Sequence, residues 1–192
     1  DDHLGDLDVT DCRLVEGGEA GLAGSPGRDA AELRSDTGEI VFDRSVKGAE
    51  TLQVSAPAAR LLIGTVGGRD FRLGDIALKV GKGTLRNYAD ISLVAMDGKQ
   101  VADSHKLLLT AVARVENKGQ KWDEKRTCVV GDWGEGPTLA EPVPLTLTLP
   151  GGGWQAHALD GQGQVVSEIT MVGSRLTTDP AHASLWYLIT RP

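Results

Sequence analysis

The chain of 192 residues is poor in aromatic side chains, in cysteine and in basic residues. It contains no run of 18 or more apolar residues, so no segment is a candidate for a membrane-spanning helix. Asp and Glu number 27 against 20 Lys and Arg, which gives a net charge of −7. A nucleic-acid-binding protein needs a basic face to meet phosphates, so this composition disfavours that class. It is neutral with respect to polysaccharides.

Cysteine occurs twice, as Cys12 and Cys128. Two interpretations stay open at this point. Either both thiols are unpaired, or they form one disulfide that ties the N-terminal segment to the rest of the domain.

Common catalytic motifs are absent as well. There is no Gly-x-Ser-x-Gly sequence of the kind that exposes a nucleophilic serine. Gly64–Gly68 is glycine-rich, but no Lys-Ser/Thr pair follows it, so it is not a phosphate-binding loop. The four histidines, at positions 3, 105, 157 and 182, lack the His-x-His and His-Glu-x-x-His spacings of zinc sites. The sequence therefore assigns no catalytic residue.

Two pairs of carboxylates are the remaining catalytic candidates, because a glycosidase needs only two such groups. They are Asp123 with Glu124 and Asp132 with Glu135. Groups this close in sequence seldom face one cleft, so loop solvation or capping of backbone amides is the simpler interpretation. Acidic loops that contain glycine can also hold a structural Ca²⁺, although no Asp-x-Asp-x-Asp-Gly loop occurs. We expect no other cofactor.

Short alternating apolar segments dominate the rest of the chain and predict about eleven to thirteen strands. The Leu61–Val66 run is continuously apolar and predicts a strand that is buried on both faces. Asp97-Gly98 and Asp160-Gly161 suit type I′ hairpin turns, which need positive φ at both central residues. Strands are expected at residues 39–43, 51–55, 61–66, 71–73, 76–80, 91–96, 107–112, 143–149, 154–159, 165–166, 175–178 and 184–189.

No segment has sustained helical periodicity, so crossover helices for a parallel sheet are missing. We therefore expect an all-β protein with an antiparallel β-sandwich of jelly-roll or immunoglobulin-like type, an up-and-down barrel being the alternative. Residues 1–34 are rich in Gly, Ala, Asp and Glu and are interpreted as a linker or extended N-terminal arm. Residues 35–192 form the predicted sandwich domain.

The segment 116–137 departs most from the strand pattern. It places Trp122 and Trp133 in a polar, glycine-containing stretch, beside Asn117, Asp132 and Glu135. Aromatic faces stack on the C–H faces of pyranose rings while polar groups bond the hydroxyls, so these five residues form the predicted carbohydrate site. Two alternatives stay open: the indoles close the end of the sandwich, or they face another domain. The other two tryptophans, Trp154 and Trp186, lie in alternating segments and are expected in the core.

Several longer segments resemble one known family. They are residues 35–43 (SDTGEIVFD), 107–117 followed by Lys121-Trp122 (LLLTAVARVEN, KW), 131–137 (GDWGEGP) and 184–187 (SLWY). Together they are similar to the C-terminal accessory β-sandwich of bacterial (β/α)₈-barrel glycoside hydrolases, over about residues 35–189. In that family the barrel carries the catalytic carboxylates, and nothing in this chain corresponds to them.

The resemblance implies a non-catalytic, carbohydrate-binding accessory domain of a secreted or periplasmic enzyme that degrades polysaccharides. Its partners would be a polysaccharide or oligosaccharide and the parent barrel, with neither nucleic acid nor membrane. The alternative is a structural sandwich that packs on the barrel and stabilises it without binding glycan. That alternative predicts an exposed apolar patch of several hundred Å² on the isolated domain. A third hypothesis, an independent hydrolase, depends on the loop carboxylates.

Overall fold

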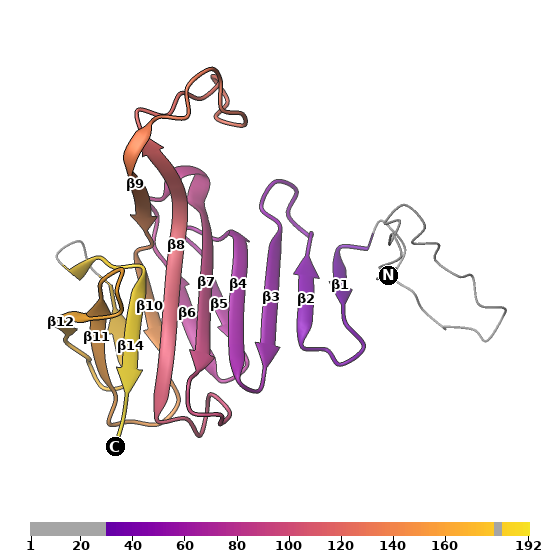
Figure 1. Cartoon of the computed structure of the whole chain (residues 1–192). Coiled ribbons are helices and arrows are strands. Elements are labelled where there is room, and N and C mark those ends of the chain that lie inside the picture. The colour runs from indigo at the N-terminus through magenta and orange to yellow at the C-terminus, as the bar shows by residue number, and fades with distance from the viewer. Residues whose placement is uncertain (1–29, 179–181) are drawn as a thin grey trace, which may run out of the picture.

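The computed structural model describes residues 30–178 and 182–192 and confirms an all-β fold with antiparallel, sandwich-like sheets (Figure 1). The strands are β1 (Glu32–Arg34), β2 (Ile40–Asp43), β3 (Thr51–Ala56), β4 (Ala59–Thr65), β5 (Asp70–Leu73), β6 (Ile76–Val80), β7 (Tyr88–Ala95), β8 (Lys106–Lys118), β9 (Glu135–Pro142), β10 (Leu145–Thr148), β11 (Gln155–Leu159), β12 (Val165–Ile169), β13 (Arg175–Thr177) and β14 (Trp186–Thr190). A short 3₁₀ helix, η2 (Leu85–Asn87), precedes β7.

In the described part of the chain, ten strands form a large sheet in the order β1-β2-β3-β4-β7-β8-β14-β11-β12, with β9 paired to β8. Four more form a small sheet in the order β13-β10-β6-β5. Figure 1 shows the small sheet behind the middle of the large one, with no strand of the small sheet behind β1 and β2. The sandwich is therefore unequal: the small sheet covers one face of the large sheet, and only in part.

The core lies between the two sheets and follows from the alternation of side chains along each strand. In β8, Leu107, Leu109 and Ala111 are buried, and in β6 every second residue is buried. Across the sheets the fully buried side chains include Leu62, Leu73, Ile76, Leu93, Leu147, Leu176, Tyr187 and Ile189. Burying these side chains between the layers stabilises the fold.

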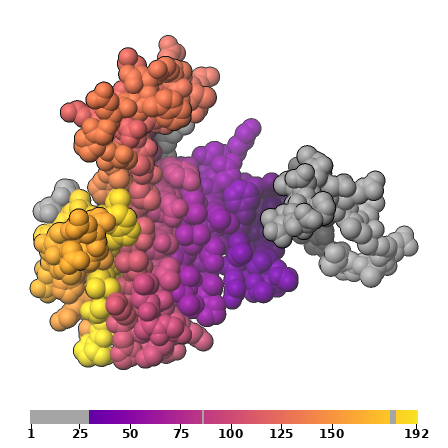
Figure 2. Space-filling model, in the orientation of Figure 1, coloured from indigo at the N-terminus to yellow at the C-terminus, as the bar shows by residue number. Residues whose placement is uncertain are grey.

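The opposite face of the large sheet is not covered by the small sheet. Residues paired across neighbouring strands lie on the same face, so the strand register identifies this outer face. Its larger apolar members include Leu33, Ile40, Phe42, Leu52, Val54, Leu61, Ile63, Val94, Leu108, Val112, Leu159, Trp186 and Leu188. All are half-buried or exposed, and Figure 2 shows this face toward the viewer. The expectation that 61–66 is buried on both faces is thus wrong, because no second layer from the described residues covers the outer face.

The two tryptophans expected in the core have different positions. Trp154 is buried, donates from Nε1 to the carbonyl of Pro150 at 2.9 Å, and lies under the guanidinium of Arg191. Trp186 pairs with Leu159 and Thr110 on the outer face and is only half-buried. The core prediction is confirmed for Trp154 and wrong for Trp186, since alternation alone does not tell which face of a strand is covered.

Two strands were not expected. Glu32–Arg34 forms β1, which pairs with β2 at the edge of the large sheet, although it falls within the segment interpreted as a linker. Glu135–Pro142 forms β9, although Gly136 and Pro137 disfavour regular strand. Residues 1–29, with Cys12, lie outside the described residues. Cys128 is exposed.

The two hairpin turns differ from the predicted type I′. Gly98 has a φ of 74°, but Asp97 is not among the non-glycine residues with positive φ in the described chain. Instead, the Asp97 carboxylate accepts from Ser104 Oγ at 2.8 Å and from the backbone N–H of His105 at 2.8 Å. It thereby organises a longer loop that sends Val101 into the core. Asp160 acts similarly by accepting from the N–H groups of Gln162 and Gln164.

Hydrogen bonds from the loop lower the pKa of Asp97 to about 2 from its ordinary 3.8, and the largest contribution comes from the backbone N–H of His105. The folded state therefore favours the ionised form, and this stabilisation is present above pH 3.8 and is lost as the pH falls toward 2. We expect Asp97→Asn to lower the melting temperature at neutral pH. The difference in melting temperature between the variant and the wild-type protein should decrease below pH 4 and nearly vanish at pH 2, as measured by circular dichroism. A difference independent of pH would contradict this role.

A buried arginine joins the two sheets. Arg60, on β4, is 8% exposed, and its side chain donates to the carbonyls of Leu73, Ala56 and Ala59. Its Nη2 also lies 2.7 Å from Asp75 Oδ1 in the turn between β5 and β6. One side chain thus satisfies polar groups of both layers.

Candidate functional site

The segment between β8 and β9, residues 119–134, projects beyond the end of the sandwich and is called the arm here (Figure 1). Trp122 and Val129 form an isolated antiparallel bridge within it. The N–H of Val130 donates to the carbonyl of Lys121, and the N–H of Asp123 donates to that of Cys128. The arm is therefore a small hairpin of its own, in which Trp122 has a defined position.

The base of the arm is held by a close backbone approach at Gly134. This residue has a φ of 70°, and a Cβ there would lie 2.5 Å from the carbonyl oxygen of Lys118 and 2.6 Å from the nitrogen of Gln120. Only glycine fits such a position. Asn117 ties the two ends of the arm together: its Nδ2 donates to the carbonyl of Trp133 at 3.1 Å, and its Oδ1 accepts from Thr138 at 2.9 Å. Gly134 and Asn117 together are called the clamp.

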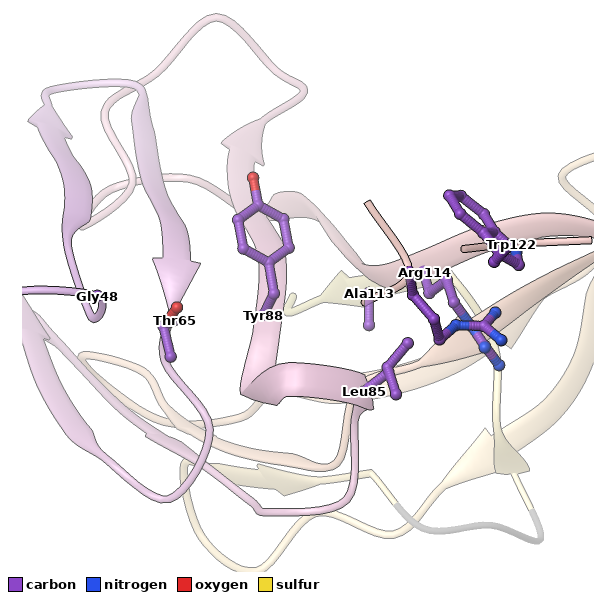
Figure 3. Close-up of a pocket in the computed structure, with 8 residues that line it drawn as sticks. Gly48, Thr65, Leu85, Tyr88, Ala113, Arg114 and Trp122 are labelled. Carbon is purple, nitrogen blue, oxygen red and sulfur yellow. The ribbon is translucent and has the colours of Figure 1, made fainter. Parts of the chain in front are cut away.

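A groove of about 460 Å³ lies where the arm meets the sandwich. In Figure 3, Tyr88 at the start of β7 and Trp122 on the arm stand apart along it, with Leu85 and Ala113 between them and Thr65 beyond Tyr88. Tyr88 is 46% exposed and Trp122 is half-buried. The complete lining is Gly48, Thr65, Leu85, Tyr88, Ala113, Arg114, Trp122 and Arg126. Aromatic walls over an apolar floor are typical of a ligand site.

The Trp122 ring is held in place by charged neighbours. Its Nε1 donates to Glu116 Oε2 at 2.9 Å, and the same oxygen accepts from Arg126. The guanidinium of Arg126 lies 5.2 Å from the centroid of the Trp122 ring, within the range of a cation–π contact. An indole fixed in this way loses little conformational entropy when a ligand stacks on it.

The same charged network connects the arm to the sandwich. Glu116 Oε1 lies 3.3 Å from Arg114, and Arg114 lies 3.9 Å from Glu141. Glu141 in turn accepts from the backbone N–H of Leu85 at 3.1 Å. These ion pairs and this hydrogen bond link the arm to β8, β9 and η2. They therefore fix the position of the arm relative to the sandwich.

The backbone is strained at two places beside the groove. Among the described residues, two that are not glycine have positive φ: Asn87, at 55°, and Arg126, at 53°. Arg126 lines the groove, and Asn87 lies between Leu85 and Tyr88, which also line it. Such strain costs about 1–3 kcal/mol for each residue and tends to cluster at functional sites.

The five residues predicted from sequence do not form one site. Trp122 lines the groove, but Trp133 lines none of the hollows described and is 71% exposed. Asp132 and Glu135 line a separate hollow of about 350 Å³ at the base of the arm, together with Lys118 and three glycines. Asn117 uses both ends of its amide within the clamp. The predicted site did not include Tyr88, Arg114 or Arg126, which lie on β7, β8 and the arm.

Two of the four loop carboxylates, Asp123 and Asp132, have structural partners. Asp123 accepts from the N–H and hydroxyl of Thr127 at 2.6 Å each. Asp132 accepts from the N–H of Gly134 and lies 3.7 Å from Lys121. Within residues 30–178 and 182–192, no three or more His, Cys, Asp or Glu side chains gather closely enough to hold a metal ion.

No helix in the described part of the chain is both long and apolar enough to cross a membrane. No protein-family model matches the chain, and neither a curated protein nor a solved structure matches it.

Proposed function

We propose that this chain is a non-catalytic carbohydrate-binding domain and that the groove between Tyr88 and Trp122 is its sugar site. The observation that carries the proposal is the pair of aromatic rings, one on the sandwich and one on the arm, with an apolar floor between them (Figure 3). Pyranose rings present flat C–H faces that pack on such rings, and charged side chains at the rim bond their hydroxyls. By the sequence resemblance, the parent protein is a secreted glycoside hydrolase that degrades polysaccharide.

The volume and openness of the groove suit part of a chain rather than an enclosed small molecule. At about 460 Å³ it falls within the usual range for ligand sites, and it lies on the surface between two elements. A polysaccharide can therefore lie along it with part of its chain between the rings.

Affinity electrophoresis and calorimetry on a panel of polysaccharides test this proposal. Xylan, mannan, β-glucan, cellulose and polygalacturonate form a suitable panel. We expect retardation by at least one glycan and competition by its oligosaccharides. If no glycan binds, the proposal fails.

The outer face of the large sheet favours a second function, packing against a partner domain. From β2 to β11 it spans seven neighbouring strands, or about 29 Å, and at roughly 14 Å in height it covers about 400 Å². An exposed apolar patch of several hundred Å² on a soluble protein is often a functional surface. Asp90 lies among these residues, and burial raises its pKa.

The sequence of two strands supports the same function. Leu61-Leu62-Ile63 and Leu107-Leu108-Leu109 are continuously apolar, as is usual for strands that are covered on both faces. The small sheet covers only one of those faces. A second layer from another domain would account for Leu61, Ile63 and Leu108, which the sandwich itself leaves half-buried.

Substituting both Phe42 and Val94 by lysine tests the packing function. These side chains are 36% and 37% exposed, so we expect the isolated domain to lose less than about 1 kcal/mol. The longer protein that contains the partner domain should melt at a lower temperature, because charge is then buried at the interface. Val172→Lys is the control, because this position is 73% exposed and lies outside this face, between β12 and β13. Equal melting of the double variant and the control in the longer protein would exclude the interface.

A further inference from the structure

The charge of the groove points to a class of sugar. Among the described residues, two arginines, Arg114 and Arg126, line the groove and no carboxylate does, although the chain as a whole carries a net charge of −7. We propose that the groove selects anionic polysaccharides, and in particular the carboxylates of uronic acid residues. This inference rests on the proposed carbohydrate-binding function and adds the class of glycan.

Both guanidinium groups retain unused hydrogen-bonding capacity. Each has five N–H donors in a planar fork that matches a carboxylate. Arg126 uses Nη2 on Glu116, and among the described residues its Nη1 donates no hydrogen bond. Arg114 contacts carboxylates at 3.3 and 3.9 Å, which are ion-pair distances rather than short hydrogen bonds.

The glutamates behind the arginines position them without removing their attraction for an anion. The side chains of Glu116 and Glu141 are 17% and 21% exposed, whereas those of Arg114 and Arg126 are 36% and 35% exposed. The positive groups are thus nearer to solvent and to an arriving ligand. A uronate ring between Tyr88 and Trp122 can stack through its C–H face while its carboxylate meets the guanidinium groups.

Aromatic rings beside arginines also suit single-stranded nucleic acid, in which bases stack and phosphates pair. Such proteins surround the stacking site with a long basic groove that follows the backbone. Here the described residues that line the groove include two arginines, each paired with glutamate, in an acidic chain. The observations therefore favour a sugar acid, and nucleic acid becomes an outcome of the test.

The experiment compares binding of four ligands to the wild-type chain by affinity electrophoresis and calorimetry: polygalacturonate, a sulfated galactan, neutral xylan and poly(U). We expect polygalacturonate to bind best. Its affinity should fall by about 10- to 100-fold in Arg114→Gln and in Arg126→Gln, because each loses a charge-assisted hydrogen bond. Raising the salt from about 0.05 M to about 0.5 M should weaken binding by the wild-type protein more than by either variant. Arg175→Gln, on an exposed position of β13 in the small sheet, is the matched control and should bind as the wild-type protein does.

Melting temperatures of the variants confirm that each remains folded, and Arg114→Gln decides the test if Arg126→Gln disturbs the arm. Tighter binding of xylan, unaffected by either substitution, overturns the anionic assignment but leaves the carbohydrate-binding function intact. Equal or tighter binding of the sulfated galactan overturns the uronate assignment. Preference for poly(U) overturns both the inference and the proposed function. Failure of all four ligands to bind, with no binding across the wider glycan panel, also overturns both.

Discussion

Replacing Trp122 by alanine should lower the affinity of the chain for its glycan by about 30-fold or more, since truncating an aromatic hot-spot residue costs about 2 kcal/mol. The indole forms one wall of the groove, and Glu116 and Arg126 fix its orientation. Its removal leaves Tyr88 as the single aromatic wall. Because Trp122 lies on the arm and outside the core, the melting temperature of the sandwich should change little. Calorimetry measures the first effect and circular dichroism the second.

Trp133→Ala is the matched control for this prediction. It removes an indole from the same arm, but one that is 71% exposed and away from the groove, so we expect unchanged affinity. Trp122→Phe keeps an aromatic face and loses the hydrogen bond to Glu116, and should retain part of the binding. Equal losses in Trp122→Ala and Trp133→Ala would place the sugar elsewhere on the arm.

Replacing Arg60 by alanine should destabilise the fold by about 3–5 kcal/mol, as is usual when one partner of a buried ion pair is removed. The substitution leaves the Asp75 carboxylate without its cation, and it deprives the carbonyls of Leu73, Ala56 and Ala59 of a donor. A domain of this kind is stable by about 5–15 kcal/mol in total, so this loss is a large fraction of it. Urea unfolding followed by tryptophan fluorescence measures the loss.

Arg34→Ala serves as the control for Arg60→Ala. Arg34 is also paired with a carboxylate, Glu32 at 2.7 Å, but both side chains are half exposed. Such surface pairs contribute about 0–1 kcal/mol. If Arg60→Ala costs no more than Arg34→Ala, the buried arginine does not hold the two sheets together.

The strands could be predicted from sequence because the alternation of side chains directly reflects their burial on one face. Leu107, Leu109 and Ala111 alternate with half-buried residues on β8, and the same holds for Leu62 on β4. What alternation does not determine is which strands the second layer covers. Trp186 was therefore assigned to the core, and the outer-face residues Leu61 and Ile63 were expected to be covered as well.

The groove could be predicted only in part, because its residues are brought together by strand pairing rather than by proximity in sequence. Trp122 was identified because an indole in a polar segment usually covers, or is covered by, something else. Tyr88 and Arg114 carry no such signal: one opens a strand and the other continues a long one. They meet because β7 pairs with β8, and Arg126 joins them because the arm turns back on itself. Asn117 has a side chain suited to sugar recognition, but the clamp at the base of the arm uses it.

The unequal size of the two sheets sets the order in which parts of the domain open. Strands β1 and β2 lack the small sheet behind them, and the inward positions of the neighbouring β3 are the polar Thr51, Gln53 and Ser55. Little buried apolar surface becomes exposed to water when these strands separate. Their amide hydrogens should therefore exchange with solvent well before those of β7, β8 and β14. A partner seated on the outer face would contact Ile40 and Phe42. It would slow exchange first at this margin, where the isolated sandwich is least protected.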